Sequence, residues 1–339
     1  MALNFIKLLR KRFRGVFPVT FIIFVLITCL LCFQGIGQYK LGAKVKPSRP
    51  FRIIGYLRTA DLSSANYPFL KDKLVTQINI AFINPDENGV IKEMPSLGGF
   101  VAMAHRNGIL VFASIGGGHR HLYFDSLLNQ DHRGKICNAY LNFMEKYNLD
   151  GLDVDIENED ITADYAPFVG ILATKLHKVD KQLSAALSYS TRNKISDQVL
   201  RYYDFITLMA YDKTGPWRPN DPGQHAPYEM SVAQLHYWEK DRGVQSDRVV
   251  LGVPFYGYGF GKDTAFAMSY SEIVNRYSGA DTKNNISLEN GTTIFYNGKD
   301  LIQQKVELAK REGSGIMIWH LKQDAVGEKS LLRAIHQIL

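Results

Sequence analysis

The chain has 339 residues, of which 46% are hydrophobic and 22% are charged. This balance is typical of a globular protein with a large core and excludes a disordered or collagen-like chain. A formal net charge of +7 would normally indicate an anionic partner, but residues 1–49 hold nine Lys and Arg and no Asp or Glu, which leaves −2 for residues 50–339. We therefore expect no nucleic-acid partner for the folded part.

Residues 1–43 are predicted to export the chain. A Lys/Arg cluster at 7–14 precedes an apolar run at 16–33, and a polar stretch follows. The 18-residue run lies between the length of a signal-peptide core, about 7–15 residues, and that of a membrane span, roughly 17–25 residues. A cleaved signal peptide and a retained membrane anchor both stay open. In either case this segment contacts the membrane, and the rest is secreted, periplasmic or anchored outside the cytoplasm.

Cysteine and histidine give no sign of a disulfide or a metal site. Removal of the apolar run leaves Cys137 alone, so no intramolecular disulfide is expected. Cys137 lies in a helical pattern, where a buried thiol is the expected state. The nine His residues are scattered without a ligand spacing. We expect neither a metal nor a cofactor.

From residue 50 onward, short β-branched runs alternate with longer amphipathic stretches, which is typical of repeated βα units. Strands are predicted at 52–56, 77–82, 109–115, 151–156, 182–187, 205–209, 249–254 and 315–318. Helices are predicted at 97–107, 134–147, 165–179, 232–240, 300–311 and 330–339. Eight units in about 290 residues predict an α/β fold, a TIM (β/α)8 barrel, as a single domain over 50–339. A doubly wound open sheet fits less well, because no G-x-G-x-x-G follows the first strand.

The most informative segment ends the fourth predicted strand. Side chains alternate along a strand, so Asp153, Asp155 and Glu157 share one face, about 7 Å apart in succession. In a barrel this face points inward, where neighbouring carboxyls repel and raise at least one pKa. An exposed strand face or a Ca²⁺ or Mg²⁺ site is the plainer interpretation, but a strand spreads the carboxylates that an ion-binding loop would gather. Glu157 also falls at the rim where barrel active sites are built.

Four segments carry a family resemblance. The sequence D-G-L-D-V-D-I-E at 150–157 resembles the D-G-x-D-x-D-x-E signature of family 18 glycoside hydrolases, the chitinases and their relatives. The sequences A-S-I-G-G at 113–117, M-A-Y-D at 209–212 and G-I-M-I-W at 315–319 resemble that family's motifs on its third, sixth and eighth strands. The resemblance extends over 53–321, nearly the whole predicted barrel.

The resemblance implies a retaining reaction that needs no enzyme nucleophile. Glu157 would be the general acid, and the substrate's own N-acetyl oxygen would attack the anomeric carbon. Asp155 would bind the acetamido N–H and share a proton with Asp153, while Tyr211 would hold the acetamido oxygen in line for attack. Asp212 would position the sugar at the cleavage site.

A groove for sugar rings needs aromatic platforms beside a few hydrogen-bonding groups. Trp319 is expected to form the floor of the cleavage site. The other predicted substrate-binding residues also lie at or just past strand ends: Tyr56, Phe82, Gly117, Met209, Trp217 and Tyr256. Core packing is the alternative for Phe82 and Met209, and close packing of the barrel interior is the alternative for Gly117.

Two features depart from the family pattern. Tyr258 stands where many members carry Arg, so one charged sugar contact is not expected here. The connection 260–315 is short for the α+β insertion that deepens the groove in many members. We therefore expect no large α+β insertion and a shallow, open groove. Such a groove favours cleavage within a chain, or of short oligomers, over processive attack on crystalline chitin.

The resemblance implies an exported chitinase-like enzyme that hydrolyses β-1,4 bonds between N-acetylglucosamine units. Its partner would be chitin or its oligosaccharides, and we expect it to act as a monomer. The same chemistry on the chitobiose core of N-glycans or on peptidoglycan is one alternative. The other is a chitin-binding lectin without activity on the same barrel; such proteins typically lose the acid equivalent to Glu157, which this chain keeps together with Asp155 and Tyr211.

Overall fold

The computed structural model describes residues 50–63, 67–262 and 264–339. The predicted export segment 1–43 lies outside these residues. Within the described ranges, no helix combines the length and the apolar character needed to cross a membrane. These residues belong to one compact unit, which holds a closed barrel and a smaller sheet.

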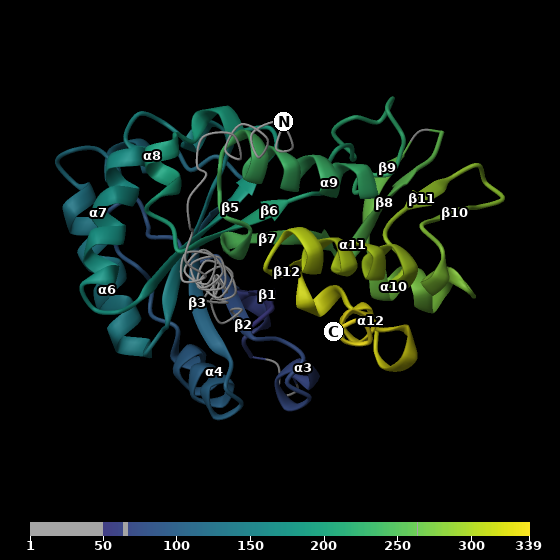
Figure 1. The fold of residues 1–339 in the computed structure, drawn as a ribbon, viewed down its shortest axis with the longest axis horizontal. Coiled ribbons are helices and arrows are strands. Elements are labelled where there is room, and N and C mark those ends of the chain that lie inside the picture. Colours follow the sequence, from purple (N-terminus) through teal and green to yellow (C-terminus); the bar gives the residue numbers. More distant parts are fainter. Residues whose placement is uncertain (1–49, 64–66, 263) are drawn as a thin grey trace, which may run out of the picture. The chain divides into compact units, whose positions relative to one another are not determined.

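Eight parallel strands close into a barrel, which confirms the predicted fold (Figure 1). In chain order they are β1 (Arg52–Arg58), β2 (Gln77–Ala81), β3 (Leu110–Gly117), β4 (Gly151–Ile156), β5 (Gln182–Ser188), β6 (Phe205–Met209), β7 (Val249–Pro254) and β12 (Gly315–Trp319). Ile54 of β1 pairs with Gln77 of β2 on one side and with Met317 of β12 on the other, so the barrel has no open edge. Every predicted strand is present, with its ends within two residues of the prediction.

Helices cover the outside of the barrel (Figure 1). They are α3 (Pro68–Lys71), α4 (Pro95–Arg106), α5 (Phe124–Leu127), α6 (Arg133–Tyr147), α7 (Tyr165–His177), α8 (Asp197–Leu200), α9 (Tyr228–His236), α11 (Lys299–Glu312) and α12 (Leu331–His336). A further helix, α10 (Tyr270–Arg276), packs against the small sheet that follows β7. Pro95 opens α4 where its missing N–H costs no hydrogen bond, and Asn148 ends α6 in the left-handed conformation. The predicted helix 232–240 is shifted, because α9 begins four residues earlier and a wider helical turn, Tyr237–Asp241, follows it.

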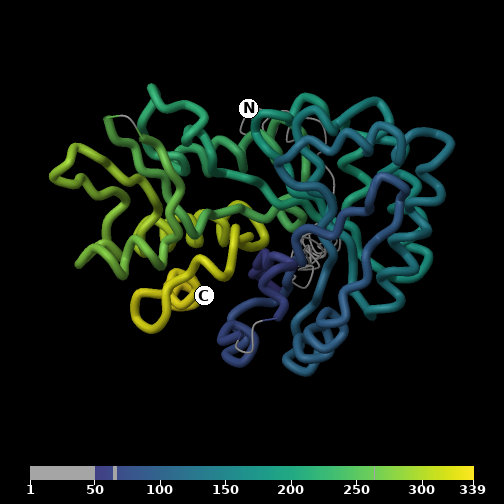
Figure 2. Tube along the Cα trace, turned by 180° about the vertical axis from the view of Figure 1, so that it is seen from behind, coloured from purple at the N-terminus to yellow at the C-terminus, as the bar shows by residue number. Residues whose placement is uncertain are grey.

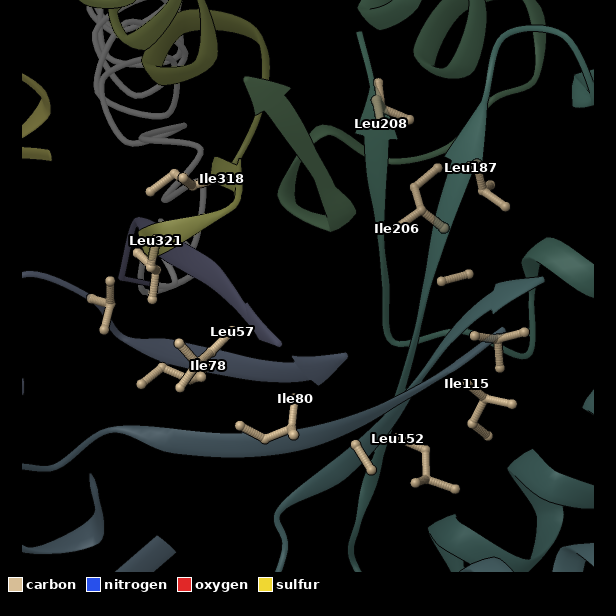
Figure 3. Packing of buried hydrophobic residues seen from close by; sticks show 14 of the residues in the cluster. Leu57, Ile78, Ile80, Ile115, Leu152, Leu187, Ile206, Leu208, Ile318 and Leu321 are labelled. Carbon is tan, nitrogen blue, oxygen red and sulfur yellow. The ribbon is translucent and has the colours of Figure 1, made fainter. Parts of the chain in front are cut away.

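The main core lies between the strands and the helices, and Figure 3 shows part of it. Leu152 of β4 belongs to this outer core, whereas Asp153 and Asp155 point the other way, into the barrel. A second cluster fills the barrel interior and includes Tyr211 and Met317. The alternation along β4 thus places its two acids on the side where the other predicted site residues gather.

The connection after β7 forms a small antiparallel sheet. Its strands are β8 (Tyr256–Phe260), β9 (Ala265–Ser269), β10 (Asn285–Ser287) and β11 (Thr293–Phe295), in the order β10-β11-β8-β9. Figure 2 shows them grouped at one side of the barrel. The absence of a large α+β insertion is confirmed for the described residues, but this small sheet was not predicted. Strands of three to five residues are too short for their alternation to stand out in the sequence.

Candidate active site

Asp153 lies inside the barrel and is fully buried. Its Oδ2 accepts hydrogen bonds from the hydroxyls of Tyr56 at 2.5 Å and Ser114 at 2.8 Å, and its Oδ1 accepts one from Ser184 Oγ at 2.7 Å. The donors come from β1, β3 and β5, so closure of the barrel itself builds this cage of hydroxyls. Burial raises the pKa of Asp153, and the three hydroxyls oppose that rise.

Asp155, two residues further along the same face of β4, has a different environment. Its Oδ1 is buried and has no hydrogen-bond partner among the described residues. Burial, the charge of Glu157 and the charge of Asp153 raise the pKa of Asp155 well above its ordinary value. This carboxyl therefore keeps its proton to a higher pH than an exposed Asp would.

Glu157 directly follows β4 at the carboxyl rim of the barrel and is partly buried. Burial and the charge of Asp212 raise its pKa to about 7. A Cβ added to Gly118 would lie 3.5 Å from Glu157 Oε1, so the backbone beyond β3 passes beside this carboxyl. A large fraction of Glu157 is thus protonated at neutral pH, as a general acid must be.

Asp212 follows β6 and has a left-handed backbone with φ of 61°. Its Oδ1 accepts hydrogen bonds from the hydroxyls of Tyr256 at 2.6 Å and Tyr258 at 3.0 Å, and His225 Nδ1 lies 3.4 Å away. Tyr258 thus contacts Asp212 through a neutral hydroxyl. Two-residue spacing puts Tyr256 and Tyr258 on one face of β8, a signal that could have identified Tyr258 from the sequence.

Tyr211 is buried beside the acids of β4. Its hydroxyl donates to Met317 Sδ at 3.8 Å, and a thioether is a weak acceptor that a ligand oxygen can replace. Burial, followed by the charges of Asp155 and Asp212, raises the pKa of Tyr211 well above its ordinary value. The phenol therefore remains a hydrogen-bond donor throughout the pH range in which proteins work.

The predicted aromatic residues gather at the mouth of the barrel. The Trp319 ring lies 5.2 Å from the Tyr56 ring and stacks on Phe82 at 5.7 Å. The hydrophobic cluster inside the barrel includes Tyr56, Tyr211 and Tyr256. Three partly buried side chains pack against it: Phe82, Met209 and Trp319. A Cβ on Gly117 would lie 2.6 Å from the Phe82 ring, so Gly117 is the residue that lets Phe82 take this position.

Trp217 differs from these residues because more than half of its surface is exposed. It lies in the loop after β6, with its ring 5.5 Å from Tyr258 in an edge-on arrangement. A Cβ on Gly215 would fall 2.4 Å from the indole, so this glycine allows the loop to fold against its own tryptophan. Trp217 is thus the exposed member of the aromatic set.

The loops around Glu157 are joined by a polar cluster that sequence reasoning missed. The buried carboxylate of Asp160 accepts hydrogen bonds from Arg120 Nη1, from the backbone N–H of His121 at 3.0 Å and from His121 Nδ1 at 2.8 Å. The backbone N–H of Asp160 in turn donates to the carbonyl oxygen of Glu157 at 3.0 Å. This cluster fixes the turn that carries Glu157 to the loop after β3.

The same cluster continues to the loop after β2. Asn84 Nδ2 lies 3.2 Å from His121 Nε2 and donates to the Gly116 carbonyl at 2.9 Å, while Asn84 Oδ1 accepts from the Gly116 N–H at 2.7 Å. A neutral His121 with its proton on Nδ1 satisfies all of these bonds together. These residues are far apart in the sequence and follow no period, so no pattern could have grouped them.

No metal site emerges from the described residues, where no group of three or more His, Cys, Asp or Glu could hold an ion. Cys137 is buried, as predicted, and burial raises its pKa to about 12. Its thiol is therefore not a nucleophile at neutral pH.

A model of the family described as glycosyl hydrolases family 18 matches residues 52–324. The GH18 chitinase ChiB from the chitin utilization locus of Flavobacterium johnsoniae aligns with a TM-score of 0.78 and 33% identity, over 86% of this chain and 94% of that chain. A class V chitinase of Nicotiana tobaccum in complex with NAG4 aligns with a TM-score of 0.72 at 21% identity, over 85% and 98% of the two chains, which supports the fold alone.

Two relatives found by sequence are also chitinases or chitinase-like proteins by description. The class V chitinase CHIT5a of Medicago truncatula is 27% identical over 74% of this chain and 80% of its own length. A chitinase-like effector of Moniliophthora roreri is 28% identical over 62% of this chain and 59% of its own length. The match thus covers little more than half of the second relative, and neither likeness by itself assigns a substrate to this chain.

Proposed function

The chain belongs to family 18 of the glycosyl hydrolases, and from that premise we propose that it hydrolyses β-1,4 bonds between N-acetylglucosamine units by a retaining, substrate-assisted reaction. One observation carries the proposal. Three carboxyls on and just after β4 have three different environments: Asp153 is caged by hydroxyls, Asp155 has an oxygen without a partner among the described residues, and Glu157 has a pKa of about 7. These environments suit Glu157 as the general acid and Asp153 with Asp155 as the pair that stabilises the positive intermediate.

In the first step Glu157 gives its proton to the glycosidic oxygen as the bond from that oxygen to the anomeric carbon breaks. The acetamido oxygen of the same sugar forms a new bond to the anomeric carbon and closes an oxazolinium ring. In the second step the Glu157 carboxylate takes a proton from water, whose oxygen attacks the anomeric carbon and reopens the ring. Two inversions retain the configuration.

Asp155 and Tyr211 would hold the acetamido group for this attack. The Oδ1 of Asp155, which has no partner among the described residues, can accept the acetamido N–H. We expect Asp155 to pass its proton to Asp153 during the reaction, so that Asp155 carries the negative charge that stabilises the oxazolinium ion. The Tyr211 hydroxyl, whose partner among the described residues is the Met317 thioether, can donate to the acetamido oxygen. The flat rings of Trp319 and Phe82 offer an apolar platform to the sugar above them.

The experiment that tests this proposal offers the full-length chain chitin oligomers, a high-mannose glycoprotein and peptidoglycan. Wild type is compared with Glu157→Gln and with Glu159→Gln, whose exposed side chain serves as the matched control. We expect cleavage of chitin oligomers, a loss of about 100-fold or more in kcat for Glu157→Gln, and no loss for Glu159→Gln.

Other outcomes would identify the alternatives. Cleavage of the glycoprotein or of peptidoglycan instead would keep the chemistry and change the substrate. Binding of chitin without cleavage of any polymer would replace the enzyme with a lectin. Undiminished activity of Glu157→Gln would show that another group is the acid.

We also propose that residues 1–43 export the barrel formed by residues 50–339, which then acts as a monomer outside the cytoplasm. The support is the basic cluster followed by an 18-residue apolar run. Addition of a protease to intact cells, with a cytoplasmic protein as the control, tests this placement. Degradation of the barrel by the protease, or its release into the medium or into an osmotic-shock fraction, is expected; protection that ends only when the cytoplasmic control is also degraded would contradict export.

A further inference from the structure

Lys305 is a buried cation that the reaction above does not use. It lies on α11, and it is the one lysine with no exposed surface in the part of the chain that the structure describes. Its Nζ donates to two uncharged oxygens, the Ala226 carbonyl at 2.8 Å and Asn297 Oδ1 at 2.7 Å. Burial lowers the pKa of Lys305 to about 7. Taking an ammonium group out of water is costly, and a Met of similar length would fill the same space without that cost, so packing alone does not explain this residue.

The bonds of Lys305 fasten one segment of the loop between β6 and α9. Asn297 Nδ2 donates to the same Ala226 carbonyl at 3.1 Å, so this oxygen is held from two sides. Gln224 Nε2 donates to the carbonyls of Tyr296 at 2.7 Å and Asn284 at 3.1 Å. The segment is thus fixed on both sides of His225, to α11 on one side and to the small sheet on the other.

His225 connects this fixed segment to Asp212. Its ring is fully buried, with Nδ1 3.4 Å from Asp212 Oδ1 and Nε2 3.3 Å from the Tyr256 carbonyl. The ring also packs against Tyr256 and Tyr258, at 5.1 and 4.8 Å, and both of these tyrosines donate their hydroxyls to the same Asp212 oxygen. The His225 carbonyl accepts the backbone N–H of Lys213, the residue after Asp212, at 2.9 Å.

We propose that Lys305 is a positioning residue for Asp212, acting through the Ala226 carbonyl and the His225 ring to hold the Asp212 carboxylate against the sugar. The inference rests on the proposed function, because it assigns Asp212 a role at the cleavage site. Asp212 needs such support since its backbone is in the left-handed region, which costs a residue other than glycine free energy. The contacts from α11 thus keep a strained residue in the orientation that the reaction requires.

A double-mutant cycle on the full-length chain tests the proposal. Lys305→Met, Asp212→Asn and the double variant are compared with wild type for kcat on chitotetraose. The control is Lys310→Met, on the same helix, whose Nζ reaches the Ile338 carbonyl at the surface. We expect Lys305→Met to lower kcat on the order of 10-fold, Lys310→Met to leave it unchanged, and the double variant to fall within about twofold of Asp212→Asn alone.

A residue that only stabilises the fold would give a different result. If Lys305 only stabilised the fold, the fold-losses in kcat of Lys305→Met and Asp212→Asn would multiply in the double variant, and this result would overturn the proposal. An unchanged kcat for Lys305→Met would overturn it as well. If Lys305→Met does not fold, Asn297→Ala takes its place, because it disturbs the same contacts more mildly. The loss of kcat caused by Asn297→Ala must likewise disappear in the Asp212→Asn background. If wild type cleaves no chitin oligomer, the proposed function fails, and the same cycle measured in Kd for chitotetraose still decides the coupling.

Discussion

Asp153, Asp155 and Glu157 lie on one face of β4 and its continuation, but each carboxyl has a different environment. Asp153 is saturated by hydroxyl donors, Asp155 keeps an oxygen without a partner among the described residues, and Glu157 faces the rim. Asp212 adds to this pattern because its charge raises the pKa of Glu157. The pKa of Glu157 thus depends on a residue at the end of another strand, β6. Two predictions about pH follow from this raised pKa.

The first concerns the alkaline limb of activity. The general-acid role proposed for Glu157 requires its protonated form, so kcat/KM should fall as the pH rises through about 7. Asp212→Asn removes a like charge, which lowers the pKa of Glu157 and moves this limb to lower pH. Asp221→Asn, an exposed carboxyl of the same loop, is the control and should leave the limb in place. A limb that stays, or moves to higher pH, in Asp212→Asn would contradict the electrostatic role of Asp212.

The second concerns stability. The pKa of Glu157 is about 7 in the folded protein against 4.5 ordinarily, so the folded state holds a proton that the unfolded chain releases between these values. The stability contributed by this proton is present below pH 4.5 and is lost as the pH rises through 7. Glu157→Gln should therefore raise the free energy of unfolding at pH 8, on the order of 1–3 kcal/mol, and much less at pH 4.5. Thermal unfolding of both proteins, with Glu159→Gln as control, measures this; an equal change at both pH values would count against it.

At the scale of elements, the carboxyl end of β3 is packed tightly against the neighbouring strand β4. Gly116 pairs with Asp155 across β3 and β4 and has φ of 110°. A Cβ added to Gly116 would lie 2.3 Å from the carbonyl oxygen of Asp155. No side chain fits there, because the obstacle is the backbone of the strand that carries the acids.

Two glycine substitutions should therefore have opposite effects. Gly116→Ala forces β3 away from β4 and should lower the free energy of unfolding by more than about 2 kcal/mol, with loss of activity. Gly99→Ala lies in the exposed middle of α4, where an added Cβ meets nothing within 4 Å, and should raise the free energy of unfolding by about 0.5–1 kcal/mol. Urea denaturation of the two variants measures both. A neutral Gly116→Ala would show that the two strands are less tightly joined than described.

The same elements show what sequence could predict. The barrel strands are covered on both faces and rich in aliphatic residues, so their positions are visible in the sequence, and alternation places Asp153 and Asp155 inside. The strands β8 to β11 are only three to five residues long, so their alternation does not stand out in the sequence, and they were missed. Lys305 is connected to His225 through the Ala226 carbonyl, which is a tertiary contact between α11 and a loop. No local pattern in the sequence predicts such a contact.

At the scale of the whole molecule, the described residues form a barrel with one small sheet beside it. The folded part carries a formal charge of −2 over residues 50–339, which suits a neutral sugar polymer better than an anionic one. The insertion after β7 is limited to four short strands and α10. We expect such an insertion to leave the groove open to the middle of a chain rather than to enclose a chain end.

An open groove predicts endo cleavage. The viscosity of a soluble chitin derivative should fall early, while few reducing ends have formed, because each internal cut shortens long chains. Viscometry with a parallel reducing-end assay gives both quantities, and acid hydrolysis provides the curve for random cutting. Dominant release of dimers from the outset, with little loss of viscosity, would be incompatible with an open groove.

The central claim is that the substrate's own acetamido group, held by Asp155 and Tyr211 and assisted by Glu157, is the nucleophile. Time-resolved proton NMR of chitotetraose hydrolysis tests this most directly, because it detects the anomer of the new reducing end before mutarotation. We predict that the β-anomer forms first and then relaxes to the equilibrium mixture. Initial formation of the α-anomer would mean that water attacks directly with inversion, and would contradict the mechanism proposed for this site.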